Sequence, residues 1–386
     1  MDNFTFKSPT QFVFGRGTQT QVGKYAVRCG AKKVMVLYGG GSAVRSGLIQ
    51  TVAESLDAAG IDFIMAGGVQ PNPVSSFVYD AIAAAREEKV DFMLAVGGGS
   101  VIDTAKAVAA GVVYDGDFLD FYRGKPVKEA LPVGVVLTIS AAGSEGSPNT
   151  VITDESTMIK KGASGDCLRP VFSILNPELT FTLPKYQIAC GISDMMAHIF
   201  ERYFTKTRDN AVTDRMCEGL LLAIRDSAMR AIIDSEDYEA QAALMWASTL
   251  AHNNICGVGR EQDWGSHALA HQLSALFDAA HGAALAVVFP AWMKYCIDED
   301  AELFARMAVN VWGVEPAEDK KAVALAGIEC YIDFLRSIGM PTTLAQLDVE
   351  EKEIPRLVEL LFAAGGAGRF KKLTPADAEA IYRLAL

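Results

Sequence analysis

The sequence contains little histidine and lacks several patterns that would assign it to other protein classes. Only five of its 386 residues are histidine, and its seven cysteines include no Cys-x-x-Cys pair. Scattered cysteines without such pairs are typical of reduced thiols rather than of disulfides or a cysteine-based zinc site. No uninterrupted apolar run approaches about 18 residues, which argues against a membrane-spanning helix.

Positive charge is also scarce, because 35 lysines and arginines face 47 acidic residues and give a net charge of −12. Nucleic acid and anionic membrane surfaces both require a basic footprint, so we expect no partner of either kind. The first residues show no basic segment followed by an apolar one, so we expect no secretion signal and a cytoplasmic location. The length predicts about two domains.

The first half of the chain alternates short apolar strands with helices. This alternation predicts βαβ units and a parallel sheet, whose ligands bind at the carboxyl ends of the strands. The expected strands are 33–38, 62–66, 91–96 and 133–137, and the expected helices are 46–59, 75–88 and one from 101.

The pattern changes near Pro184, after which strand signals almost vanish and helical spacing dominates. We therefore predict an α/β dinucleotide-binding domain over 1–184 and an all-helical metal-binding, catalytic domain over 185–386. The expected helices of the second domain are 186–204, 208–232, 237–255, 263–277, 299–313, 318–337 and 350–364.

Two glycine-rich loops each follow a strand and precede a helix, at Gly39–Ser42 and Gly97–Ser100. Glycines let the backbone approach a pyrophosphate, and the next helix N-terminus offers free N–H groups. Neither loop matches G-x-G-x-x-G, and a tight turn without a ligand is the alternative. Two such loops on one sheet favour a nucleotide.

The first loop bears on the choice of nicotinamide cofactor. An NAD enzyme commonly places a carboxylate at this strand end to bind the ribose 2′-hydroxyl, and none stands after Tyr38. Ser42 and Arg45 instead offer donors to a 2′-phosphate. This favours NADP(H) over NAD(H).

Four of the five histidines fall into two clusters. Asp194 and His198 lie four residues apart, as do His267 and His271, and His281 follows. Residues four apart share a helix face, so the clusters suit a divalent ion such as Fe²⁺, Zn²⁺, Co²⁺ or Ni²⁺. Surface hydrogen bonds or core histidines are the alternative, and spacing does not decide between His271 and His281 as a ligand.

These residues resemble the iron-containing (group III) alcohol dehydrogenase family, and most closely its NADPH-dependent butanol dehydrogenase and aldehyde reductase branch. The resemblance runs along nearly the whole chain, and its motifs are specific only in combination. They are Gly97-Gly-Gly-Ser-Val-Ile-Asp103, Gly143-Ser-Glu145, Leu183-Pro184, Gly191-Ile-Ser-Asp194-Met-Met-Ala-His198-Ile-Phe-Glu201, Trp264-Gly-Ser-His267-Ala-Leu-Ala-His271 and His281-Gly282.

The resemblance implies the roles of individual residues. Asp194, His198, His267 and His281 match the metal ligands, and His271 matches a histidine near the substrate and nicotinamide, as proton relay or as a structural residue. The implied cofactor contacts are Gly40, Gly41 and Ser42 on the adenosine phosphate, Gly98, Gly99 and Ser100 on the pyrophosphate, and Thr138 and Lys160 beyond. Gly97, Asp103 and Leu179 complete the cofactor residues that we assign.

The resemblance also implies a dehydroquinate synthase-like architecture, an active site in the cleft between the domains, and a homodimer. We therefore predict a metal-dependent, NADP(H)-linked enzyme that interconverts a primary alcohol and an aldehyde, such as butanol and butyraldehyde. The ion is Fe²⁺ or Zn²⁺, with Ni²⁺ or Co²⁺ as alternatives. It acts as a Lewis acid on the substrate oxygen.

Three other functions compete with this prediction. A lyase or cyclase resembling dehydroquinate synthase would need a basic pocket, and residues 256–282 contain only Arg260 as a cation. A metal-dependent hydrolase with an incidental nucleotide domain is the second alternative. A metal-stabilised binding protein without turnover is the third.

Overall fold

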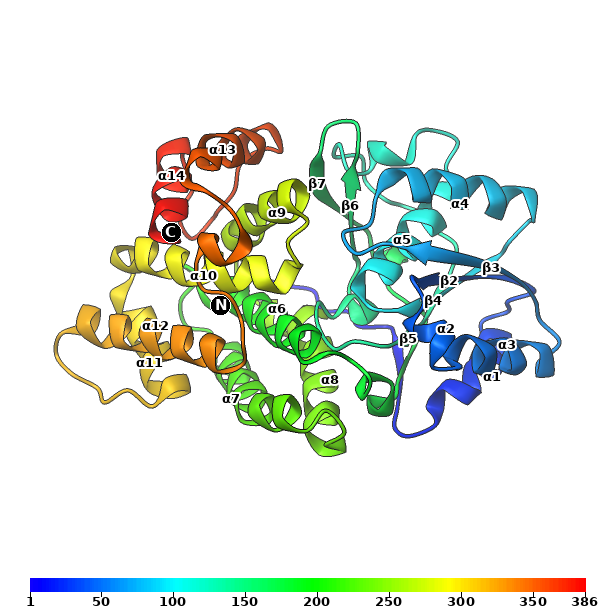
Figure 1. The fold of residues 1–386 in the computed structure, drawn as a ribbon, viewed down its shortest axis with the longest axis horizontal. Coiled ribbons are helices and arrows are strands. Elements are labelled where there is room, and N and C mark those ends of the chain that lie inside the picture. Colours follow the sequence, from blue (N-terminus) through cyan, green and yellow to red (C-terminus); the bar gives the residue numbers. More distant parts are fainter. The chain divides into compact units, whose positions relative to one another are not determined.

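The computed structural model describes residues 1–386, which form two compact units (Figure 1). One unit is Lys7–Leu183. The other unit combines Pro184–Leu386 with the first residues of the chain, Met1–Phe6. The boundary at Pro184 separates all the strands from the long helices.

The unit Lys7–Leu183 is built on a six-stranded parallel sheet with the order β1-β8-β5-β4-β2-β3. This confirms the expected α/β class. The two outer strands at one edge, β1 and β8, were not expected, because four residues are too few for a clear pattern. The strands are β1 (Gln11–Phe14), β2 (Lys33–Gly39), β3 (Asp62–Val69), β4 (Phe92–Gly97), β5 (Val133–Leu137) and β8 (Phe172–Leu175).

Helices cover both faces of this sheet, with α1 and α3 on one face and α4 and α5 on the other (Figure 1). Every residue of β4 is buried as a result. A strand covered on both faces has no solvent side, which explains its continuous apolar run. The helices are α1 (Val22–Arg28), α2 (Ser42–Arg45), α3 (Leu48–Ala58), α4 (Ser75–Glu87) and α5 (Gly99–Val112).

A separate antiparallel hairpin joins β6 (Asn149–Asp154) to β7 (Ile159–Ser164). It was not expected from the sequence, because the two strands contain polar residues on both faces. The hairpin is tied to the rest of its unit where the backbone N–H of Thr153 donates to the carbonyl of Pro73 at 2.8 Å.

The second unit is helical, as expected. Its helices are α6 (Lys185–Tyr203), α7 (Ala211–Ile233), α8 (Tyr238–His252), α9 (Gly265–Phe277), α10 (His281–Cys296), α11 (Ala301–Trp312), α12 (Lys320–Ser337), α13 (Ile354–Ala363) and α14 (Pro375–Leu384). None of the helices is long and apolar enough to cross a membrane.

Helix α10 is the one long helix that the sequence did not predict. It contains Pro290, a residue that normally breaks helices, and it is buried on nearly all sides. A helix without a solvent face has no polar stripe, so its sequence shows no helical period. This matters for function because α10 begins at His281.

Candidate metal centre and nucleotide loops

Three helices of the second unit bring the predicted metal ligands together. Helix α6 contributes Asp194 and His198 one turn apart, α9 contributes His267, and α10 begins at His281. The Oδ1 atom of Asp194 lies 3.4 Å from Nε2 of His198, 4.0 Å from Nε2 of His267 and 3.8 Å from Nε2 of His281.

These distances fit a divalent cation. Metal–ligand bonds of about 2.0–2.2 Å place tetrahedral donor atoms roughly 3.3–3.6 Å apart, close to the observed separations. Asp194, His267 and His281 each offer a donor atom within 4.8 Å of the others, and His198 adjoins this group through Asp194. One carboxylate with three imidazoles suits iron, zinc, cobalt or nickel better than magnesium or calcium.

Burial favours the protonation state of His198 that a cation needs. The side chains of Asp194 and His198 are only 5% and 6% exposed. Burial, followed by the charges of His252 and His267, lowers the pKa of His198 well below its usual value. The ring is therefore neutral at pH 7, which leaves a nitrogen lone pair to bind a cation.

Arg202, one turn beyond His198 on α6, contacts residues that surround the predicted metal ligands. Its Nη1 donates to the carbonyl oxygen of His198 at 2.6 Å, and its Nη2 lies 3.1 Å from Nδ1 of His252. The guanidinium also lies 4.7 Å from the ring centroid of Trp264, just before α9. Burial lowers the pKa of Arg202 to about 10, so it stays charged at pH 7 and donates to His252.

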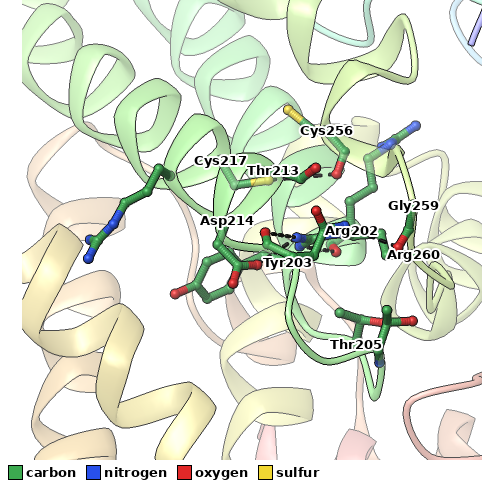
Figure 2. A network of polar contacts seen from close by, with 12 residues as sticks. Arg202, Tyr203, Thr205, Thr213, Asp214, Cys217, Cys256, Gly259 and Arg260 are labelled. Atoms are coloured by element: carbon green, nitrogen blue, oxygen red, sulfur yellow. Dashed lines mark hydrogen bonds and ion pairs between the residues drawn. The ribbon is translucent and has the colours of Figure 1, made fainter. Parts of the chain in front are cut away.

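Arg260 extends this network away from the site. It donates to the carbonyl oxygen of Arg202 at 3.1 Å and contacts Asp214 at 2.6 Å, and its side chain is fully buried. Figure 2 shows the two arginines side by side within these contacts. Arg260, the only lysine or arginine of residues 256–282, therefore has a structural role. It offers no free cation to a basic pocket of the kind that the lyase alternative required.

Two buried carboxylates contact the beginning of α9: Glu201, which lies on α6, and Asp263, which lies just before α9. Glu201 accepts a hydrogen bond from the backbone N–H of His267 at 2.9 Å, and its Oε1 lies 2.8 Å from Nδ1 of the same residue. Burial raises the pKa of Glu201 to about 7, against the effect of the backbone N–H groups that it accepts from. Asp263 accepts from the N–H groups of Gly265, Arg369 and Phe370.

Helix α10 approaches α6 unusually closely at Gly282. A Cβ atom at this position would lie 2.0 Å from the carbonyl oxygen of Cys190, far inside van der Waals contact. Only glycine allows the two helices to meet here. Since His281 precedes Gly282, this contact sets the distance between His281 and Asp194.

His271 lies beside the predicted ligands and is half-buried. Its ring centroid is 5.2 Å from that of His281 and 6.4 Å from that of His267. It is not among Asp194, His267 and His281, whose donor atoms lie within 4.8 Å of one another. His281 thus lies within this group and His271 lies beside it, and their different roles stay predictions.

In the other unit, both glycine loops lie at a reversal of the sheet. The chain places β3 on one side of β2 and β4 on the other, so the strand order changes direction between β2 and β4. Open α/β sheets bind ligands in the crevice at such a point, beyond the carboxyl ends of the strands. Gly39–Ser42 follows β2 and Gly97–Ser100 follows β4, where Tyr38 pairs with Val96.

Sterics explain the glycines of the second loop. A Cβ atom at Gly97 would lie 2.5 Å from Val101, and one at Gly98 would lie 2.2 Å from Ile139. Helix α5 begins at Gly99, so its first turn, with N–H groups that lack helical partners, starts directly at the strand end. Both features suit an approaching phosphate.

Asp103 and Lys106 tie α5 to the segment that leads into β6. The carboxylate of Asp103 accepts from the hydroxyl of Ser144 at 2.6 Å and from the N–H of Val151 at 2.9 Å. The buried Lys106 donates to the carbonyl oxygens of Ser144 and Ser147 at 2.6 and 2.9 Å, and burial lowers its pKa to about 8. Asp103 therefore has a clear structural role, and its predicted contact with the cofactor stays a prediction.

The other predicted cofactor residues lie in the same unit. The N–H of Thr138 donates to the carbonyl of Gly97 at 3.1 Å, which places Thr138 beside the second loop. Lys160, on β7, donates to Asn72 at 2.7 Å. Leu179 packs against the hydrophobic core from the short 3-10 helix Pro177–Thr180. Their contacts with a cofactor stay predictions.

Sequence reasoning assigned no role to Glu201, Arg202 or Lys106. Each is a charged residue that is fully buried within a helix. Charged residues are rarely buried unless they are paired, so charge inside an apolar helical stretch was the available signal. The Glu201-Arg202 pair directly after the His198 motif carried that signal most clearly.

Comparison with known proteins finds matches to both units of the chain. Residues 9–177 match the family model "Iron-containing alcohol dehydrogenase", and residues 188–386 match "Fe-containing alcohol dehydrogenase family, C-terminal". The chain is 40% identical to "Probable NADH-dependent butanol dehydrogenase 1" of Bacillus subtilis over 100% of both chains. It is 35% identical to "NADPH-dependent aldehyde reductase YqhD" of Escherichia coli over 94% of this chain and 93% of that one.

A solved structure is similar over the same length. It is the NADH-dependent butanol dehydrogenase A of Thermotoga maritima, at 41% identity and a TM-score of 0.97, covering 100% of this chain and 99% of that one. The matches extend over both units.

The contact at Gly282 yields a testable prediction. Gly282→Ala should push α10 away from α6, lower the unfolding free energy by about 1–3 kcal/mol and weaken divalent-metal binding, because overpacking displaces His281. Thermal unfolding and chelator competition measure the two effects.

Gly219→Ala is the matched control in α7, where a Cβ atom meets nothing within 4 Å. It should raise stability by roughly 0.5–1 kcal/mol. Wild-type metal affinity in Gly282→Ala would contradict the prediction.

Proposed function

The chain belongs to the iron-containing alcohol dehydrogenase family and is an NAD(P)-dependent oxidoreductase; on that premise we propose a metal-dependent, NADP(H)-linked interconversion of primary alcohols and aldehydes. The observation that carries the metal is the Asp194 carboxylate, with three imidazole nitrogens within 4.0 Å of it. The butanol or butyraldehyde class of substrate follows the names of the relatives. A cytoplasmic homodimer remains the sequence prediction.

In this proposal Asp194, His198, His267 and His281 hold the ion, which supplies Lewis acidity toward the substrate oxygen when bound. Asp194 offsets part of the positive charge, and the neutral imidazoles leave the ion electrophilic. The nicotinamide cofactor would donate or accept the hydride. His271, with its ring centroid 5.2 Å from that of His281, passes the alcohol proton to water or to a ribose hydroxyl.

Metal removal and reconstitution test the proposal directly. Chelated protein should not oxidise NADPH with butyraldehyde, and addition of Fe²⁺, Zn²⁺, Co²⁺ or Ni²⁺ should restore the loss of NADPH absorbance. His281→Ala should lower metal affinity more than about 100-fold, since even residues that only orient a ligand contribute about 10–100-fold. His271→Ala is the matched control and should retain the metal. Full metal content and activity in His281→Ala would remove the assignment.

The loop after β2 supports the phosphorylated cofactor. It contains no carboxylate between Tyr38 and Ser42, and a Cβ atom at Gly41 would lie 2.8 Å from Nη1 of Arg45. The guanidinium thus lies against Gly41, where a 2′-phosphate would accept its hydrogen bonds. The relatives' names include both cofactors, so they do not decide the choice.

We expect kcat/KM for NADPH to exceed that for NADH. Arg45→Ala should lower the NADPH value about 10–100-fold, because a hydrogen bond to a charged group contributes roughly 1.5–3 kcal/mol. The NADH value is the internal control and should not change, since NADH has no 2′-phosphate. Steady-state kinetics with both cofactors provide the measurement. A preference for NADH in the wild type would overturn this choice.

His271 has a test that separates a proton relay from a structural residue. As a relay, His271→Ala should lower kcat on the order of 10²-fold and remove a pH-dependent step, with little change in metal content or unfolding temperature. A structural histidine would lower the unfolding temperature and leave the shape of the pH profile intact. Unchanged kcat would remove the relay.

A further inference from the structure

Glu201 contacts both the backbone at the beginning of α9 and the side chain of His267, a predicted metal ligand on that helix. It stands three residues after His198 on α6, and its side chain is fully buried. Its Oε2 accepts from the N–H of Trp264 at 2.6 Å, and its Oε1 accepts from the N–H of His267 at 2.9 Å. The same Oε1 lies 2.8 Å from Nδ1 of the His267 ring.

The two backbone contacts hold the beginning of α9. Trp264, the residue before the helix, has a φ of 65° and provides no side-chain cap. A helix N-terminus leaves N–H groups without helical partners and carries partial positive charge. The carboxylate of Glu201, which lies on α6, accepts hydrogen bonds from two of these groups. It therefore fixes α6 to the first turn of α9, which contains His267.

The third contact determines which ring nitrogen of His267 is available. Both oxygens of Glu201 face N–H groups, which a carboxylate accepts. With Nδ1 protonated toward Glu201, the lone pair of the neutral ring stands on Nε2. That atom lies 4.0 Å from Oδ1 of Asp194, on the side of the predicted ligands.

We propose that Glu201 is a positioning residue for the metal centre, which holds His267 in the Nδ1–H tautomer and in the orientation that offers Nε2 to the ion. The inference rests on the proposed metal centre. It assigns Glu201 no contact with substrate or cofactor. A carboxylate that accepts from a ligating histidine fixes the ring and raises its basicity.

Asp263 provides a matched control within the same region. It is also a buried carboxylate, and it also accepts backbone N–H groups at the start of α9, from Gly265 at 3.0 Å. Its other contacts hold the backbone of Arg369 and Phe370. A purely structural role for Glu201 would therefore make the two carboxylates equivalent in their effect on metal binding.

The experiment compares the isosteric variants Glu201→Gln and Asp263→Asn in the full-length, metal-free protein. Zn²⁺ affinity is measured by competition with a chromophoric chelator. In parallel, ¹⁵N-labelled histidine reports the tautomer of His267 by NMR, which is practical because the chain has only five histidines. Thermal unfolding of the metal-free proteins measures the shared structural effect.

We expect Glu201→Gln to lower Zn²⁺ affinity about 10–100-fold and to abolish the slowly exchanging Nδ1–H proton of His267, since an amide offers one acceptor where the carboxylate offers two. Asp263→Asn should lower the unfolding temperature but leave both the Zn²⁺ affinity and that proton unchanged. Equal losses of Zn²⁺ affinity in both variants would reduce Glu201 to helix packing and overturn the inference.

The inference and the proposed function fail in distinguishable ways. Wild-type Zn²⁺ affinity in Glu201→Gln, with a wild type that binds Zn²⁺, would overturn the role of Glu201 and leave the metal centre standing. A wild type that binds none of Fe²⁺, Zn²⁺, Co²⁺ or Ni²⁺ would remove the metal centre and the role of Glu201 with it.

Discussion

The buried carboxylate of Asp194 imposes the central constraint on the helical unit. A charge that is taken out of water is costly unless opposite charge or hydrogen bonds compensate it. Three imidazole nitrogens surround its Oδ1 at 3.4–4.0 Å, and burial keeps at least His198 neutral. Neutral imidazoles compensate a carboxylate poorly, and the cation of the proposed metal centre would supply that compensation. In that proposal the local stability and the chemistry of this unit depend on the same atoms.

The surroundings of Asp194 are built to keep those atoms in place. Arg202 braces the His198 turn, Glu201 ties α9 to α6, and Gly282 lets α10 reach Cys190. Each of these residues acts on a different helix of the site. Buried polar networks make a core rigid when their members are hydrogen-bonded, and both Arg202 and Glu201 behind the site contact several partners.

The nucleotide loops follow a different physical rule. They need no buried charge, because the phosphate groups that they suit are held by backbone N–H groups at helix N-termini. Their requirement is the absence of side chains, and the close approaches of Gly97 and Gly98 to Val101 and Ile139 impose it. In the proposed function, Arg45 and the absence of a carboxylate between Tyr38 and Ser42 favour NADP(H) over NAD(H).

The sequence by itself determined the α/β class of the first half, the helical second half, the two glycine loops and the Asp194–His198 pair, since each depends on local periodicity or spacing. Only the tertiary structure placed His281 beside Asp194, because α10 is buried on nearly all sides and shows no helical period, although the family resemblance had already implied the role of His281. The tertiary structure alone revealed Glu201 and Arg202 as partners of the site, because their contacts join residues on different helices. Local sequence patterns reflect which face of a segment is exposed to solvent, whereas a metal centre depends on contacts between residues that are distant in the sequence.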